Sequence, residues 1–209
     1  MRIPMRLTKW LSPKHASHGV PVWTPVTGTG ERPLIYELLD EALNLLKASA
    51  PGRYERVRHS LKGILIFGKD SIRGSYMSDT GICRLRESFM LAPDTTAAAI
   101  ACVLVHEATH GRLFRLGIPY DELLRYRVEM VCIKATLLTA RRLPRAEVEV
   151  DRCRRQLTLD PKYLSNESFT QRADGELREL GAPVWLIRFS IWFRRRRATT
   201  QPQRRAIRK

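Results

Sequence analysis

Two histidines four positions apart, with a glutamate directly after the first, are the residues of this sequence best suited to chemistry. They are His106, Glu107 and His110, in the run His-Glu-Ala-Thr-His. Residues i and i+4 share one face of a helix, so both imidazoles can bind one Zn²⁺ at about 2.0–2.1 Å. Glu107 lies about 100° further around the helix, where it can take a proton from a water on the metal. The spacing predicts a hydrolytic zinc site, and the alternative is an ordinary helix with two packed histidines.

A zinc site of this kind needs a third protein ligand. No histidine follows His110 in the chain. If the helix after Pro119 packs antiparallel to the motif helix, its ligand lies about 10–16 Å along it, at about 1.5 Å per residue. Glu129 is the acidic residue at that height, whereas Asp121 and Glu122 lie too close to the turn. We therefore expect Glu129 as the ligand, with an ion pair to an arginine one turn earlier as the alternative.

A cysteine is the other possible source of a metal ligand. Cys102 lies one turn before His106, but its alanine neighbours are typical of a small core residue. The four cysteines form no C-x-x-C pair, which favours buried thiols in a reducing compartment: Cys83, Cys102, Cys132 and Cys153.

Peptide hydrolysis also needs a hydrogen-bond donor for the oxyanion that forms on the carbonyl. Tyr126, three residues before Glu129, lies on the same helix face and is the expected donor. Its rivals are Tyr120, Tyr76, His59 and Arg127. A tyrosine on a helix more often packs against neighbours, which is the alternative for Tyr126.

The elements that position these residues follow from hydrophobic periodicity and from helix breakers. We expect helices at 34–49, 94–116, 120–142, 145–157 and 168–180, and strands at 62–67 and 81–87. The second strand is expected at an edge, because its two arginines share one face. Segments 11–33 and 68–75 are expected to be irregular. The predicted class is α+β, mostly helical, with a small sheet flanking the motif helix.

Composition predicts four parts: an irregular N-terminal arm at 1–33, a catalytic domain at 34–157, a helical extension at 158–197 and a basic disordered tail at 198–209. The formal charge is +16, and the last 22 residues carry nine basic and no acidic side chains. The apolar run at 184–193, followed by four arginines, fits an interfacial helix on an anionic membrane, a helix docked on the core, or a nucleic-acid contact. No apolar run has the length of a signal peptide or membrane span, so we expect a cytoplasmic protein, with membrane association through this segment as an option.

The order of strand, edge strand, motif helix and glutamate-bearing helix resembles that of gluzincins. The chain is similar to minigluzincin-like metallopeptidases, including the domain of phage-repressor-cleaving proteases, over roughly residues 61–144. The resemblance rests on the segments 105–110 (Val-His-Glu-Ala-Thr-His) and 128–132 (Val-Glu-Met-Val-Cys). The chain departs from larger gluzincins where they carry an orienting carboxylate, since Ile133 and Lys134 stand one turn after Glu129.

The resemblance implies a zincin-like fold, with His106, His110 and Glu129 as zinc ligands and Glu107 as general base. It also implies that a peptide or protein substrate adds to the edge strand near 81–87. We therefore expect a zinc-dependent metallopeptidase that uses a metal-activated water. The alternatives are a zinc hydrolase of another substrate, and a basic membrane- or nucleic-acid-associated protein with a structural zinc site.

Overall fold

The computed structural model describes residues 14–24, 30–67, 72–165, 168 and 183. The chain divides into two compact units, residues 1–159 and residues 160–209. The described element of the second unit is a 3-10 helix at Pro161–Leu164. The helix expected at 168–180 and the apolar and basic segments expected at 184–209 lie outside the described residues.

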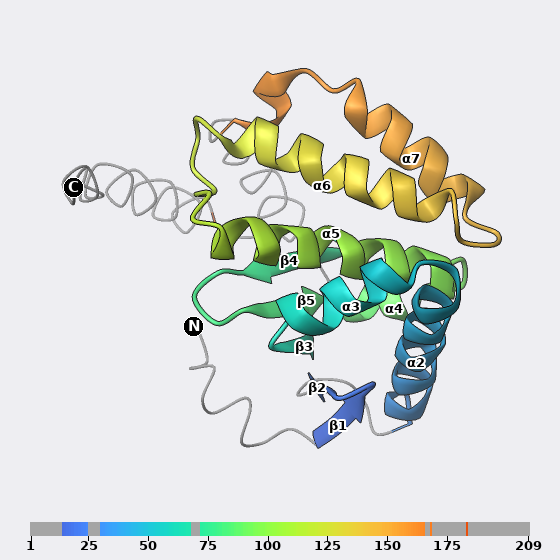
Figure 1. Cartoon of the computed structure of the whole chain (residues 1–209). Coiled ribbons are helices and arrows are strands. Elements are labelled where there is room, and N and C mark those ends of the chain that lie inside the picture. The colour runs from blue at the N-terminus through green and yellow to red at the C-terminus, as the bar shows by residue number, and fades with distance from the viewer. Residues whose placement is uncertain (1–13, 25–29, 68–71, 166–167, 169–182, 184–209) are drawn as a thin grey trace. The chain divides into compact units, whose positions relative to one another are not determined.

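The first unit contains a five-stranded mixed sheet (Figure 1). Its strands are β1 (Lys14–Ser17), β2 (Val20–Trp23), β3 (Gly63–Ile66), β4 (Gly74–Met77) and β5 (Ile82–Leu85), in the spatial order β1-β2-β3-β5-β4. The β1–β2 and β4–β5 pairs are antiparallel, whereas β3 runs parallel to both β2 and β5. The expected α+β class with a small sheet is confirmed.

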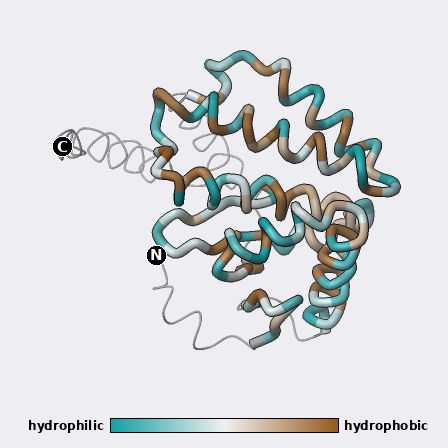
Figure 2. The backbone as a smooth tube through the Cα atoms, viewed as in Figure 1, coloured by the Kyte–Doolittle hydropathy of each residue, from teal (hydrophilic) through white to brown (hydrophobic). Residues whose placement is uncertain are grey.

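The described residues of this unit also form six helices: α2 (Arg32–Ser49), α3 (Pro51–Ser60), α4 (Glu87–Met90), α5 (Ala97–Arg115), α6 (Arg125–Ala140) and α7 (Glu147–Leu157). Helix α5 contacts α2, α3, α6 and α7, and it also contacts β4 and β5. Hydrophobic and hydrophilic residues are mixed along α6 without a single apolar face (Figure 2). Among the described residues, no helix combines the length and the apolar character needed to cross a membrane.

The motif helix α5 is held at both ends and packs closely along its length. Its N-terminus is capped by Thr96, whose hydroxyl accepts from the Ala99 N–H at 3.1 Å. Near its other end, a Cβ on Gly111 would lie 3.0 Å from both the Ser60 carbonyl oxygen and the Tyr76 ring. Glycine therefore allows α5 to lie directly against the end of α3 and against β4.

The interpretation of residues 11–33 as irregular is wrong for residues 14–23. These residues form the β1–β2 hairpin, with φ of 51° at His18 and 81° at Gly19 in its turn. Each strand is only four residues long, and β2 also pairs with β3, some 40 residues later in the chain. Such strands depend on tertiary pairing more than on local sequence, which explains why periodicity missed them.

The edge-strand prediction is also wrong, because β5 lies inside the sheet and β4 lies at its edge. Both arginines of the 81–87 segment contact Phe67: the Arg84 guanidinium lies 5.7 Å from the ring centre, and Arg86 Nη1 donates to the carbonyl at 3.3 Å. The two side chains therefore do not need an open edge. The expected irregular segment 68–75 is wrong at its last two residues, which begin β4.

A buried ion pair joins the start of β4 to α7, and it offers a test of the packing. Arg73 Nη1 lies 2.7 Å from an oxygen of Glu149, whose side chain is 6% exposed. We expect Arg73→Ala to lower the free energy of unfolding by about 1–3 kcal/mol in urea titrations, because Glu149 keeps only a weaker partner in Arg152, at 3.8 Å. The control is Arg154→Ala, which breaks an exposed pair with Asp151 and should change it by less than about 0.5 kcal/mol. Equal losses in both variants would contradict this assignment.

Candidate metal centre

Helices α5 and α6 lie side by side and bring the three expected ligands together (Figure 1). His106 Nε2 and His110 Nε2 are 3.2 Å apart. The two oxygens of Glu129 lie 3.3 Å from His106 Nε2 and 3.4 Å from His110 Nε2. The three side chains are only 13–21% exposed. One i, i+4 pair on α5 and one carboxylate on α6 therefore converge on a single point.

Each of these three distances has the size expected between two donor atoms that share a zinc ion. Donor atoms bound to zinc at about 2.0–2.1 Å with tetrahedral angles lie about 3.3–3.4 Å apart. The observed separations of 3.2, 3.3 and 3.4 Å are of this size, and a different oxygen of Glu129 faces each histidine. Two imidazole nitrogens facing each other and a carboxylate form a donor set that suits zinc, so the residues present fit the metal that the sequence indicates.

The charges of the cluster favour the ligand forms of Glu129 and His110. Burial raises the pKa of the Glu129 carboxyl, but the two histidines and the Tyr120 hydroxyl outweigh burial and lower it to about 2. Burial, together with the nearby His106, lowers the pKa of His110 to about 4. For His106 burial acts downward, but Glu129 and Glu107 leave the net pKa raised. Glu129 is thus ionised and His110 neutral at pH 7, which are the forms that bind metals.

Glu107 has the opposite character to Glu129. The residue is 5% exposed, and burial raises the pKa of its carboxyl to about 7. His106 and a hydrogen bond from the Tyr76 backbone N–H on β4 act against burial, while Glu129 adds to the rise. A carboxyl group that titrates near neutral pH can both accept and return a proton, as a general base and acid must.

Tyr120 contacts two of the three ligand residues. Its hydroxyl donates to Glu129 Oε1 at 2.5 Å, and its ring meets the His110 ring edge-on at 5.2 Å between centroids. Tyr120 lies before the start of α6, in the connection that was expected to be helical from residue 120. The sequence signal was its position just after Pro119, but only the fold brings it to the ligands.

Cys132 is a possible metal ligand that sequence reasoning did not single out. Its thiol sulfur and the donor nitrogens of His106 and His110 all lie within 4.8 Å of one another. Cys132 follows Glu129 by three residues, which is the spacing that places two side chains on one helix face. That spacing could have identified it. Cys102, the cysteine considered from the sequence, is buried and does not belong to this group.

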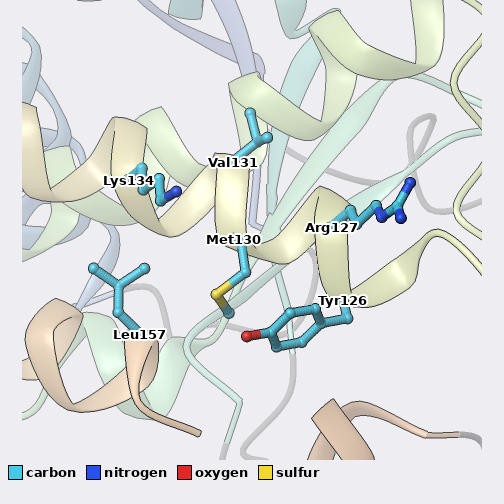
Figure 3. A pocket seen from close by; sticks show the side chains of 6 residues that line it. All are labelled: Tyr126, Arg127, Met130, Val131, Lys134 and Leu157. Carbon is cyan, nitrogen blue, oxygen red and sulfur yellow. The ribbon is translucent and has the colours of Figure 1, made fainter. Parts of the chain in front are cut away.

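Tyr126, the expected oxyanion donor, lines a surface hollow that is separate from the candidate metal centre. The lining of that hollow is Tyr126, Arg127, Met130, Val131, Lys134 and Leu157, which includes none of the three ligand residues. Figure 3 shows Tyr126 and Met130 projecting from α6 to the same side. Among the other candidates for the oxyanion donor, Tyr120 contacts Glu129, and Tyr76 hydrogen-bonds Glu107 through its backbone. Arg127 lines the same hollow as Tyr126. His59 hydrogen-bonds the Glu55 carbonyl at 2.7 Å.

Comparisons of this chain with protein-family models, with curated proteins and with solved structures find no match.

The raised pKa of Glu107 predicts that its ionisation lowers the free energy of unfolding, and that this loss depends on pH. The effect can be measured in metal-free protein. The carboxyl has a pKa of about 7 when folded and 4.5 ordinarily, so wild-type stability falls as pH rises between those values. Glu107→Gln keeps the shape without the charge. The variant should be more stable than wild type by up to about 3 kcal/mol above pH 7, with a smaller gap at pH 5, in denaturant titrations.

The matched control is Glu122→Gln, whose side chain is 45% exposed. Its stability relative to wild type should stay constant over the same pH series. A gap between Glu107→Gln and wild type that does not change with pH would show that Glu107 is ionised in both states.

Proposed function

We propose that the chain is a zinc-dependent metallopeptidase of the minigluzincin-like kind, with a zincin-like fold. The observation that carries the proposal is the set of separations of 3.2–3.4 Å among the donor atoms of His106, His110 and Glu129. Glu107, next to a ligand on the same helix, adds the buried carboxyl that hydrolysis requires. A zinc ion held there would supply the Lewis acidity that polarises a carbonyl and lowers the pKa of a water.

The roles of the protein groups follow from their surroundings. Glu107 takes a proton from the attacking water at its carboxylate and passes that proton to the leaving amine. Tyr120, rather than Tyr126, is the proposed donor to the oxyanion, since its hydroxyl is already at the ligand cluster. In the absence of substrate, the same hydroxyl orients the Glu129 carboxylate.

The edge of the sheet supports a peptide as the substrate. Strand β4 pairs with β5 on one side and with no other described strand, and its Tyr76 backbone N–H reaches Glu107. An extended peptide that adds to an open edge gains main-chain hydrogen bonds without a specific sequence. A peptide on β4 would therefore run beside the proposed base, which favours peptide hydrolysis over a non-peptide substrate.

A structural zinc site is the second candidate, and Cys132 is the observation that favours it. Two histidines, a carboxylate and a thiolate would give four protein ligands, as closed structural sites have. Anionic membranes or nucleic acids, proposed as partners of the basic C-terminal segment, would bind residues outside the described part of the chain.

The metal ligands are tested by metal content. The purified wild-type chain should hold about one zinc per chain by elemental analysis, and Glu129→Ala should hold much less, because a three-ligand site loses its only charged donor. Glu122→Ala, which removes an exposed carboxylate in the connection before α6, should keep the wild-type content. A wild-type protein that holds no zinc after reconstitution would rule out the metallopeptidase.

The role of Glu107 is tested by turnover with the metal in place. Zinc-loaded wild-type protein should release new amino groups from unfolded casein. Glu107→Gln should keep its zinc but lose about 10²–10⁴ in rate, the usual contribution of a general base. Retained hydrolysis in the zinc-loaded variant would exclude Glu107 as the base.

A further inference from the structure

The donors at the metal centre form two pairs on adjacent helices. Helix α5 supplies the i, i+4 pair His106 and His110, and α6 supplies the i, i+3 pair Glu129 and Cys132. Both pairs lie where α5 and α6 pack against each other. The thiol of Cys132 lies within 4.8 Å of the donor nitrogens of both histidines. The α5–α6 contact therefore gathers four potential metal ligands and not three.

The Cys132 sulfur would need to move only a short distance to bind a metal held by the two histidines. With zinc bonds of about 2.0–2.1 Å to nitrogen and about 2.3 Å to sulfur, the nitrogen and sulfur donors of a tetrahedral site lie about 3.6 Å apart. The thiol thus needs to approach the histidine nitrogens by about 1.2 Å at most from its position within 4.8 Å. A side-chain movement of that size does not require α6 to shift.

The surroundings of Cys132 distinguish it from the other cysteines. Its side chain is fully buried. Cys83, Cys102 and Cys153 are equally buried but lie outside the group of donors. A thiolate is a soft ligand that favours zinc or cobalt over magnesium, calcium or manganese. Cys132 would therefore make the site selective as well as tighter.

We propose that Cys132 is a fourth protein ligand of the metal in the resting protein. This inference rests on the metal site of the proposed function and concerns its regulation. Four protein donors complete the tetrahedron, so that no position is open to a substrate carbonyl or a water. The resting site is closed, and hydrolysis requires Cys132 to leave the metal while His106, His110 and Glu129 remain.

The test replaces zinc with cobalt in the full-length chain and compares wild type with Cys132→Ser and Cys153→Ser. A thiolate bound to Co²⁺ gives an intense near-ultraviolet charge-transfer band. We expect the band in wild type and in Cys153→Ser, and its loss in Cys132→Ser while visible cobalt bands remain. Cys153 is the matched control, because it is a buried thiol that packs beside Ile133 of α6.

X-ray absorption of zinc-loaded wild type gives a second readout that needs no variant. It should show one sulfur neighbour at about 2.3 Å beside nitrogen and oxygen neighbours. A zinc- or cobalt-loaded protein without that sulfur neighbour or band would overturn the fourth ligand and leave the three-ligand site standing. The band surviving in Cys132→Ser would likewise overturn it. A wild-type protein that binds neither metal would overturn this inference and the proposed function together.

Discussion

Helix α5 must be buried on several sides and still bring three polar side chains to one point, and the rest of the first unit depends on that constraint. It contacts four helices and two strands. The small side chains of the Ala97–Ala101 stretch and Gly111 allow this close packing. Because the neighbours fix both the position and the rotation of α5, they also fix the directions in which His106, Glu107 and His110 point.

The sheet and the metal centre are coupled through one residue of β4. The backbone N–H of Tyr76 bonds the Glu107 carboxylate, and its ring packs where α5 carries Gly111. The backbone that would receive a peptide and the carboxyl that would move the proton are thus held by the same strand. A substrate that displaced β4 would also displace Glu107, the proposed base. Peptide binding and proton transfer would therefore both require β4 to stay in its present position.

Local spacing was sufficient to predict that His106, His110 and Glu129 lie together, and tertiary pairing determined what the sequence left open. The histidine spacing and the height of Glu129 follow from helix geometry, which is independent of the rest of the fold. Tyr120 was placed behind Tyr126 as the expected oxyanion donor because α6 was expected to begin at residue 120, whereas it begins at Arg125. The Asp121 side chain accepts from the Leu124 N–H at 3.1 Å, and such local bonds compete with helix formation. The edge strand was misplaced for a related reason. In the sequence, Arg84 and Arg86 indicate an open, solvent-facing edge, but both contact Phe67 inside the fold.

The two acidic residues of the centre are separated by environment and not by type. Glu129 faces both histidines and the Tyr120 hydroxyl, which hold its pKa near 2. Glu107 is more deeply buried, and its pKa is about 7. A pair of carboxyls whose environments drive their pKa values apart identifies which one stays charged and which one exchanges a proton. A bound dication would lower both values but would act most on the carboxylate that ligates it. This separation of the two pKa values agrees with the proposed roles, Glu129 as ligand and Glu107 as base.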